Sequence, residues 1–544
     1  MTFSLKAKKI LVIDDFPGMR KSVREMLYTL DAFDINEVGS GIEAIAAMAK
    51  DHFDIVLCDY NLGAGKTGLQ ILEEVRVRKL LPFSAVFIMI TAEQTPGMVL
   101  GAMENKPDEY LTKPFTTRQL LTRIERNIQR KIYLADIERE KEKQNWPAAI
   151  RLCESKLHSS QRKYHSHLQK LRAELAIATG DFKFARSIYD DVLKQRNLNW
   201  AQYGLGEICF LQGNYEQAVT ILEQVVEQSP MMMEAYDCLA RAYLAIEKKV
   251  EAEEILKTAI GLSPQAILRQ QKLAGVAENN GNIEVANKAY QAAVELGKNS
   301  IHKSSADYSG LAKLHNKNNE SEQALTVINA MREEFNNDTE SELRAALIEN
   351  SIFQGQGEAE LVEQSYQRAK ILFKHLQTVP KELQLEMAVI CHKNNESELA
   401  DQIVGNLIKN HIDDDAFMSE IKASQDDLGK AGESDMLINK TRKELVEINN
   451  KGVRLFKQGR LPEAVQLMER AREKMPANKT IILNFIKILL QDAKVSGVNK
   501  DKLLQIQQLM NQAMKLGTAP HKIGSIKMEY SRIIQAQKQG ESNG

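Results

Sequence analysis

The chain has 544 residues, of which 43% are hydrophobic and 27% are charged. This length is too great for one ordinary domain and predicts several separate cores. The 72 basic and 73 acidic residues give a formal net charge of -1, which argues against a surface for nucleic acid or for an acidic membrane.

Two further absences narrow the class of protein. The first residues lack the apolar core of a signal peptide, and no stretch reaches the roughly 18 apolar residues of a membrane span. The five cysteines lie far apart and form no CxxC pair, so neither a disulfide framework nor a zinc site is indicated. We therefore expect a cytoplasmic protein with reduced cysteines and no membrane partner.

The first 127 residues alternate between short apolar runs and stretches of helical periodicity. Each helical stretch follows an apolar run, which is the pattern of repeated βα units. The sequence therefore predicts an α/β domain with a doubly wound, five-stranded parallel sheet of the flavodoxin-like kind. The expected strands cover residues 9–14, 35–38, 55–57, 85–91 and 109–112.

Polar residues end four of these five strands. Asp14 and Asp15 end the first, Asp59 the third, Thr91 the fourth and Lys113 the fifth. The carboxyl ends of parallel strands share one edge of a sheet, and ligands bind at that edge. Three carboxylates cannot all stay ionised close together unless a cation offsets their repulsion. A hard divalent ion, Mg²⁺, fits this donor set.

The same residues predict phosphoryl chemistry. A carboxylate such as Asp59 can attack phosphorus and become an aspartyl phosphate. Thr91 would donate a hydrogen bond and Lys113 a positive charge to the phosphoryl oxygens. Any one aspartate alone is better explained as a solvated strand end or a helix cap, so the prediction depends on the whole set.

Residues 8–127 resemble the receiver domain of bacterial two-component response regulators. Asp14-Asp15, Asp59, Thr91 and Lys113-Pro114 follow one another in the family's order, and Tyr110 takes the position of the family's switch aromatic. The resemblance implies that Asp59 accepts a phosphoryl group from a histidine kinase or a histidine phosphotransfer protein. It also implies that Asp15, Asp59 and the backbone of Asn61 hold Mg²⁺, with Asp14 acting through water.

The loop after Asp59 departs from the family pattern. The segment NLGAGKTG lacks the usual proline and places Gly68 nine residues after Asp59, one more than is usual. Gly63 and Gly65 make it more mobile, so partner choice or phosphoryl lifetime can differ from the family norm. Polar groups at Asn61 and Glu93 are further candidates, because they could position a hydrolytic water.

After about residue 130 the strand pattern disappears and the sequence resembles tetratricopeptide repeats. Residues 199–230 carry the repeat's small and aromatic residues, and two further copies follow at intervals of 34 residues. Weaker copies lie on both sides. The small residues have a packing reason, since they let two helices approach closely. Function would therefore belong to the array, whose concave groove binds a protein partner.

These patterns divide the chain into five parts. We expect a receiver domain in residues 1–127, a first block of an all-α solenoid in 128–410, and an irregular insert or hinge in 411–444. A second block of the solenoid would occupy residues 445–538, and residues 539–544 would form a frayed tail.

The last receiver helix is expected to join the two halves. Helical periodicity runs from Thr117 to Asn145 without glycine or proline, enough for one helix of about 28 residues or roughly 40 Å. One interpretation makes this helix a rigid lever that reports the state of Asp59 through Thr91 and Tyr110. The alternative is that the helix breaks within the charged stretch 138–143, leaving the two parts merely tethered.

The sequence favours a response regulator of a phosphorelay that switches the protein interactions of its repeats, with self-association of the receiver as a further possibility. It contains no Walker, GxSxG, kinase or HExxH motif and no basic recognition helix, so we expect neither an enzymatic output domain nor nucleic acid. Two alternatives remain open at this stage. One is a constitutive scaffold that uses the receiver for docking, and the other is a phosphate sink without an output partner.

Overall fold

The computed structural model describes residues 4–92, 97, 100, 101, 104–159, 162–497 and 499–541. By its internal contacts the chain forms two compact units. The first consists of residues 1–143, 148–173 and 183–314, and the second of residues 144–147, 174–182 and 315–544. None of the helices in the described ranges is both long and apolar enough to cross a lipid bilayer.

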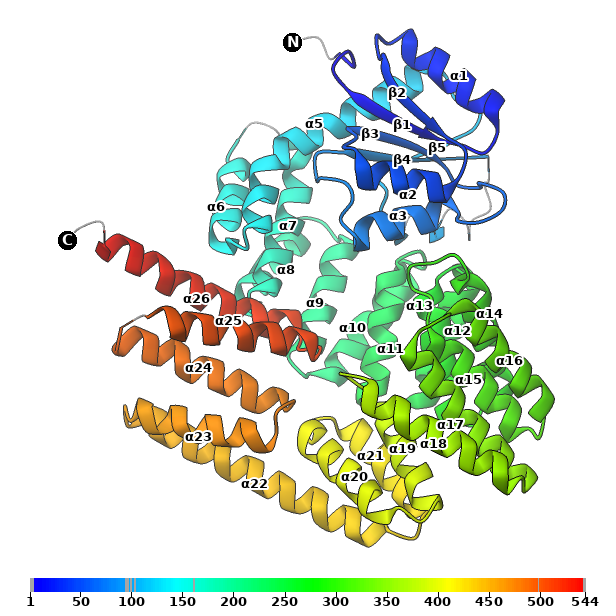
Figure 1. The fold of residues 1–544 in the computed structure, drawn as a ribbon. Coiled ribbons are helices and arrows are strands. Elements are labelled where there is room, and N and C mark those ends of the chain that lie inside the picture. Colours follow the sequence, from blue (N-terminus) through cyan, green and yellow to red (C-terminus); the bar gives the residue numbers. More distant parts are fainter. Residues whose placement is uncertain are drawn as a thin grey trace. The chain divides into compact units, whose positions relative to one another are not determined.

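The N-terminal domain is built on a parallel sheet with the strand order β2-β1-β3-β4-β5 (Figure 1). Each expected strand is present within two residues of its predicted ends. The helices around the sheet also follow the predicted order. The strands are β1 (Lys9–Ile13), β2 (Asp34–Val38), β3 (Ile55–Asp59), β4 (Val86–Thr91) and β5 (Glu109–Thr112). The helices are α1 (Pro17–Tyr28), α2 (Gly41–Lys50), α3 (Gly68–Val77) and α5 (Thr117–Glu142).

Alternation along the strands gives the sheet two apolar faces. Ile10 and Val12 pack with α1 and α5 on one face, whereas Leu11 and Ile13 pack with α2 and α3 on the other. A strand that is covered on both faces reads as a continuous apolar run, which explains why these strands could be recognised. In the helix expected near residues 97–105, the described residues Gly97, Leu100, Gly101 and Glu104 are helical.

The rest of the described chain is helical, as predicted. Helices of the first unit or at its edge are α6 (Trp146–Leu157), α7 (His165–Ala178), α8 (Phe182–Gln195), α9 (Asn199–Leu211), α10 (Tyr215–Gln228), α11 (Met233–Ala245), α12 (Lys249–Leu262), α13 (Ile267–Asn279), α14 (Ile283–Gly297) and α15 (Ser305–Lys317). Those of the second unit are α16 (Ser321–Glu334), α17 (Thr339–Gln356), α18 (Ala359–His375), α19 (Lys381–Lys393), α20 (Ser397–His411), α21 (Asp415–Asp426), α22 (Ala431–Lys457), α23 (Leu461–Lys474), α24 (Lys479–Val495), α25 (Lys500–Lys515) and α26 (Pro520–Glu541).

The small residues of the repeats lie where helices touch. Ala218, Ala252 and Ala286 are fully buried. A Cβ atom added to Gly206 would lie only 2.9 Å from the Leu222 side chain of the paired helix. At Gly204 the added atom would lie 2.2 Å from the ring of Tyr189. These positions serve packing, as the repeat pattern predicts.

Two expected boundaries fall within helices. The segment 411–444 contains α21 and the first half of α22, and α22 continues without interruption past residue 444 to Lys457. The predicted start of the second solenoid block therefore lies in the middle of a 27-residue helix. At the C-terminus α26 extends to Glu541, and residues 542–544 of the predicted tail lie outside the described residues.

Helix α5 is continuous from the N-terminal domain into the solenoid. It spans 26 residues, Thr117–Glu142, and includes most of the stretch in which the alternative placed a break. It ends three residues before the predicted Asn145 because Gln144 has a positive φ. Tyr133 of α5 donates a hydrogen bond to the Lys156 carbonyl of α6, and Lys156 forms an ion pair with Asp136. The expected pairing of this helix with the one that begins near Trp146 is confirmed.

Candidate functional site

The sheet order brings three carboxylates together. Strand β1 lies between β2 and β3, and Ile13 is paired with Cys58, so the residues at the carboxyl ends of these strands meet at one edge. Carboxylate oxygens of Asp14, Asp15 and Asp59 lie within 4.8 Å of one another. Asp14 and Asp59 are 4% and 8% exposed, whereas Asp15 is exposed. The cluster is open to solvent on the Asp15 side.

Lys113 provides the positive charge of the cluster. Its Nζ lies 2.8 Å from Asp14 Oδ2 and 3.0 Å from Asp59 Oδ1. Burial disfavours the ammonium charge, but the hydrogen bonds to the two carboxylates outweigh this effect and raise the pKa of Lys113. For Asp59 the balance is reversed: desolvation raises the pKa of its carboxyl, and the hydrogen bond from Lys113 only partly opposes the rise.

Thr91 lies on β4, next to β3, and Tyr110 lies on β5, the strand beyond β4. Thr91 ends β4, is 2% exposed and pairs with Thr112 of β5. Its carbonyl accepts a 2.7 Å hydrogen bond from the backbone N–H of Lys113. Tyr110 is half-buried and packs against the core on the α2 and α3 face. The residues selected at strand ends therefore lie at the carboxyl edge of the sheet, and Tyr110 lies on β5, the strand that Lys113 follows.

The loop after Asp59 borders the cluster. Asn61 is exposed, and its Oδ1 accepts a hydrogen bond from the N–H of Gly63. A Cβ atom on Gly63 would lie 3.0 Å from Asp15 Oδ2, and one on Gly68 would lie 2.2 Å from the Asp59 carbonyl oxygen. Larger residues would disturb the loop at both places. Glu93, the other candidate for positioning water, lies outside the described residues.

The donor set fits a divalent cation. Three carboxylates on one solvent-accessible edge offer the oxygen ligands that Mg²⁺ prefers, and the remaining positions can be taken by water. Lys113 already contacts Asp14 and Asp59, so a cation would join from the exposed Asp15 side. In chemical terms, the edge presents the largely buried Asp59 carboxylate, one member of a three-carboxylate cluster, beside the Lys113 ammonium group.

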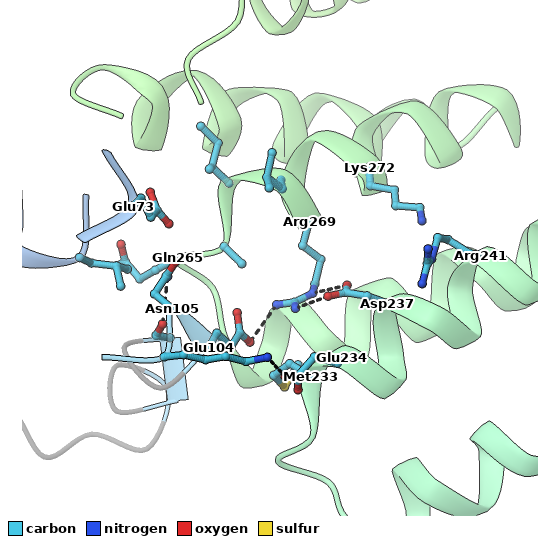
Figure 2. Close-up of a pocket in the computed structure, with 16 residues that line it drawn as sticks. Glu73, Glu104, Asn105, Met233, Glu234, Asp237, Arg241, Gln265, Arg269 and Lys272 are labelled. Carbon is cyan, nitrogen blue, oxygen red and sulfur yellow. Dashed lines mark hydrogen bonds and ion pairs between the residues drawn. The ribbon is translucent and has the colours of Figure 1, made fainter. Parts of the chain in front are cut away.

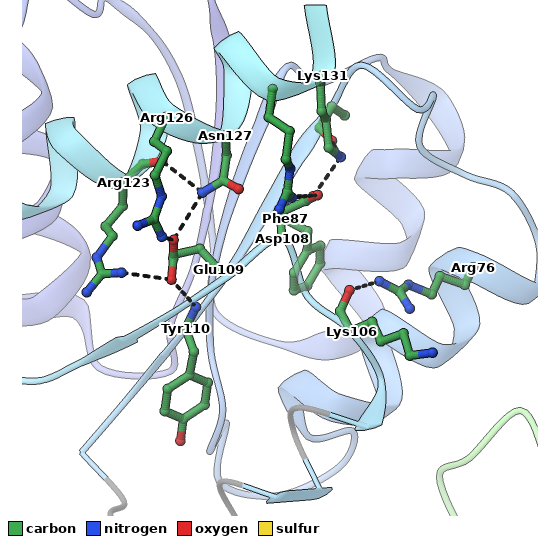
Figure 3. Close-up of polar contacts among 12 residues, drawn as sticks. Arg76, Phe87, Lys106, Asp108, Glu109, Tyr110, Arg123, Arg126, Asn127 and Lys131 are labelled. Carbon is green, nitrogen blue, oxygen red and sulfur yellow. Dashed lines mark hydrogen bonds and ion pairs between the residues drawn. The ribbon is translucent and has the colours of Figure 1, made fainter. Parts of the chain in front are cut away.

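A second polar network, which the sequence did not indicate, connects β5 to α5 (Figure 3). Glu109 accepts hydrogen bonds from Arg123, Arg126 and Asn127 of α5. Asp108, just before β5, pairs with Lys131 at 2.7 Å and accepts a hydrogen bond from the Phe87 N–H. The basic residues recur along α5 at helical spacing, which is the only sequence signal that could have revealed this network.

Comparison with known proteins identifies the N-terminal domain. A sequence profile for the response regulator receiver domain matches residues 10–125. The chemotaxis protein CheY-3 of Vibrio cholerae is 32% identical over 125 residues, which make up 95% of that protein and 23% of this chain. The chain belongs to the response regulators. Its receiver domain is also 32% identical over 122 residues to the chemotaxis protein CheY of Pseudomonas aeruginosa, covering 97% of that protein and 22% of this chain.

Tetratricopeptide repeat profiles match three parts of this response regulator beyond the receiver, residues 170–231, 210–276 and 448–474. These profile matches give the architecture of a receiver fused to tetratricopeptide repeats. Among solved structures, a CheY-like receiver domain protein from Methanospirillum hungatei matches at 22% identity over 23% of this chain and 95% of its own, with a TM-score of 0.21. Chemotaxis protein CheY4 of Vibrio cholerae matches at 27% identity over 22% and 97% of the two chains, also with a TM-score of 0.21.

Proposed function

We propose that Asp59 is the phosphoacceptor of this response regulator. The observation that carries the proposal is the position of the Lys113 ammonium, 2.8 Å from Asp14 and 3.0 Å from Asp59, beside a three-carboxylate cluster. A carboxylate oxygen of Asp59 attacks the phosphorus of a phosphohistidine in a histidine kinase or a histidine phosphotransfer protein. The P–N bond breaks, its electron pair stays with the imidazole nitrogen, and an aspartyl phosphate forms.

Each remaining residue of the site has a separate task. Asp15, Asp59 and the backbone carbonyl of Asn61 would hold Mg²⁺, with Asp14 reaching it through water. The ion would neutralise charge on the phosphoryl oxygens when it is bound. Lys113 is kept protonated by its two carboxylate partners and balances the growing charge on the same oxygens, while the Thr91 hydroxyl donates a hydrogen bond to one of them.

The phosphoryl group would be reported to the solenoid through β5 and α5. Thr91 and Tyr110 change position when the phosphoryl oxygens attract the threonine, and Glu109 connects the strand of Tyr110 to Arg123, Arg126 and Asn127 on α5. Because α5 is a single helix, it acts as a lever on the first repeats or on self-association of the receiver. The output is a change in how the tetratricopeptide groove binds its protein partner.

We also propose that the protein is cytoplasmic. Cys58, Cys153, Cys209, Cys238 and Cys391 are all free and buried. Unbonded cysteines are the normal state in a reducing compartment, and the cytoplasm is such a compartment. Phosphorylated histidine donors would have to meet the receiver there.

Labelling with a small phosphodonor tests the phosphoacceptor. With acetyl phosphate and Mg²⁺, the wild type should gain one phosphoryl group, seen by intact mass spectrometry and stable to acid but not to base. Asp59→Asn should gain none. Asp54→Asn is the matched control, because Asp54 also lies beside β3 but pairs with Lys8 outside the cluster. A wild type that is not labelled would favour the constitutive scaffold, and labelling that survives Asp59→Asn would exclude Asp59.

A further inference from the structure

A cavity of about 320 Å³ lies against helices α11 and α13 of the first compact unit (Figure 2). Asp237 and Arg241 line it from α11, and Arg269 and Lys272 line it from α13. The members of each pair are three or four residues apart, so they share one face of their helix. Among the described residues that line the cavity, four are carboxylates and four carry a cationic group. The pairing of these groups determines which charges remain available to a ligand.

Three of the four carboxylates are paired with two of the cations. Asp237 accepts two 2.9 Å hydrogen bonds from Arg269, and Glu104 lies 3.3 Å from the same guanidinium. Glu234 lies 2.9 Å from Lys106. Arg269 is buried, and a buried charge that loses its partner is strongly destabilising. These groups therefore stabilise the packing and are not available to a ligand.

The other two cations, Arg241 and Lys272, form a pair of like charges. Their charged ends face each other from α11 and α13 (Figure 2). Glu73, the fourth carboxylate of the cavity, forms a hydrogen bond with Asn105 instead. Within the part of the chain that the structure describes, neither Arg241 nor Lys272 forms an ion pair with a carboxylate. Two cations without a counter-ion at the side of a cavity favour an anionic ligand.

Lys272 is also a nucleophile. Burial and the neighbouring Arg241 guanidinium lower the pKa of Lys272 from 10.5 to about 8, against the opposing effects of Asp237 and Cys238. At pH 7 the uncharged fraction of an amine with this pKa is roughly 300-fold larger than that of an ordinary lysine. Only the uncharged amine has a free electron pair with which to attack an electrophile. The cavity therefore combines an anion-binding guanidinium with a reactive amine.

We propose that Arg241 and Lys272 form an acylation site at which acyl phosphates modify Lys272. The planar guanidinium of Arg241 holds the phosphate group of the donor. The electron pair of Lys272 Nζ attacks the carbonyl carbon, and the bond between this carbon and the phosphate oxygen breaks. Inorganic phosphate leaves with the electron pair of that bond, and the nitrogen loses a proton to water. The products are an amide on Lys272 and inorganic phosphate.

The site is independent of the proposed phosphoacceptor. Asp14, Asp15 and Asp59 are not among the described residues that line the cavity. Acylation makes Lys272 neutral and leaves Arg241 as a single cation on this face of α11 and α13. The modification therefore changes the charge of the tetratricopeptide array without changing the acid cluster of the receiver.

Peptide mass spectrometry of the full chain, treated with acetyl phosphate, measures the rate of acetylation at each lysine. At pH 7 Lys272 should react about tenfold faster than Lys288, because the gain in uncharged amine exceeds the loss of nucleophilicity that accompanies lower basicity. Lys288 is the reference, since it lies on the neighbouring α14 and its side chain is 73% exposed. The rate at Lys272 should level off above about pH 8, whereas that of an ordinary lysine continues to rise.

Arg241→Gln tests the binding of the phosphate group. Arg241 is exposed, so the variant should fold normally. An uncharged acetyl ester supplies the same acyl group without a phosphate. In the wild type, the ratio of the acetyl phosphate rate to the ester rate should be about tenfold higher at Lys272 than at Lys288, as expected for a hydrogen bond to a charged group. In Arg241→Gln the two ratios should be equal.

The outcomes keep this site separate from the phosphoacceptor, because acetyl and phosphoryl additions differ in mass. Asp59→Asn should lose phosphorylation and keep the wild-type rate of acetylation at Lys272. Equal rates at Lys272 and Lys288 in the wild type would overturn the acylation site. A donor ratio at Lys272 that is unchanged by Arg241→Gln would overturn the role of Arg241 in holding an acyl phosphate. A wild type that is acetylated at Lys272 but not phosphorylated would contradict the proposed function and support this site.

Discussion

The receiver and the solenoid differ in what their recognisable residues indicate. In the receiver, the proposed chemistry depends on a few polar side chains at fixed strand ends, and Lys113 is placed within 3.0 Å of two of them. In the solenoid, the recognisable residues are small and buried, such as Gly206 and Ala218, and they determine how helices pack. A motif therefore suggests a reaction for the first region, whereas it indicates only the scaffold of the second. The binding surface of a solenoid arises from its superhelix, which no single residue encodes.

The largest expected effect concerns the connection between the two regions. Insertion of Gly-Gly after Glu140 would interrupt α5 and displace α6 and the later helices by about 3 Å and roughly 200°. The receiver would then no longer be joined to the solenoid by one continuous helix, so phosphorylation should no longer change partner binding. Labelling of Asp59 should persist, because the acid cluster lies outside α5. Unchanged switching in the insertion variant would mean that α5 is only a tether.

A second prediction tests whether the small residues of the repeats serve packing. Gly204→Ala would place a methyl group 2.2 Å from the buried ring of Tyr189, and such overpacking costs about 1–3 kcal/mol of unfolding free energy. Gly275→Ala is the control, since nothing lies within 4 Å of its added Cβ and alanine favours a helix by about 1 kcal/mol over glycine. Urea unfolding followed by circular dichroism measures both.

A change in the packing of the solenoid should leave the phosphorylation of the receiver unchanged. Asp59 labelling should be unaffected by Gly204→Ala, because Gly204 belongs to α9 and the acid cluster belongs to the strand ends of the receiver. Equal stability of the two alanine variants would show that Gly204 is not a packing constraint. Loss of labelling in Gly204→Ala would show that the two regions are less separable than their sequences indicate.

The smallest expected effect is the pH dependence of receiver stability. Burial raises the pKa of Asp59 in the folded state above its ordinary value, so stability falls as pH rises from the ordinary value to the raised pKa, and the penalty is complete above it. Below the ordinary value of 3.8, the carboxyl is neutral in both states and the penalty vanishes. Without Mg²⁺, Asp59→Asn should therefore raise the melting temperature at neutral pH, and the gain should shrink as pH falls through the raised pKa. A gain that is constant with pH would contradict this explanation.

Much of the fold could be predicted because its signals are local. Strands β1, β3 and β4 are largely apolar runs of five or six residues, and α5 shows uninterrupted helical periodicity from Thr117. The strand-end residues Asp14, Asp15, Asp59, Thr91 and Lys113 could be found because parallel strands bring their carboxyl ends to one edge. The continuous α22 was not foreseen, since the repeat pattern lapses between Ala400 and Ala464 although the helix does not.

The contacts between the receiver and the solenoid could not be predicted for a physical reason. Lys66 and Asn299 are separated by 233 residues, and their meeting depends on the summed rotations of several helix pairs. Glu104 and Arg269 likewise look like ordinary surface charges in the sequence, but they form an ion pair in which Arg269 is buried. The sequence shows that the loop after Asp59 departs from the family pattern, but it does not show that the loop region contacts the end of α14. Long-range contacts of this kind leave no periodic or spacing signal.

The central claim is that the phosphoryl state of Asp59 controls what the solenoid binds. The most direct measurement is a pull-down from a lysate of the native organism, using the full chain with and without acetyl phosphate and Mg²⁺, and Asp59→Asn under both conditions. The account predicts that the wild type captures a protein in one state and at least about fivefold less of it in the other, the lower end of typical coupling between sites, while Asp59→Asn captures equal amounts in both. Equal capture by the wild type in both states, with phosphorylation verified by mass, would contradict it.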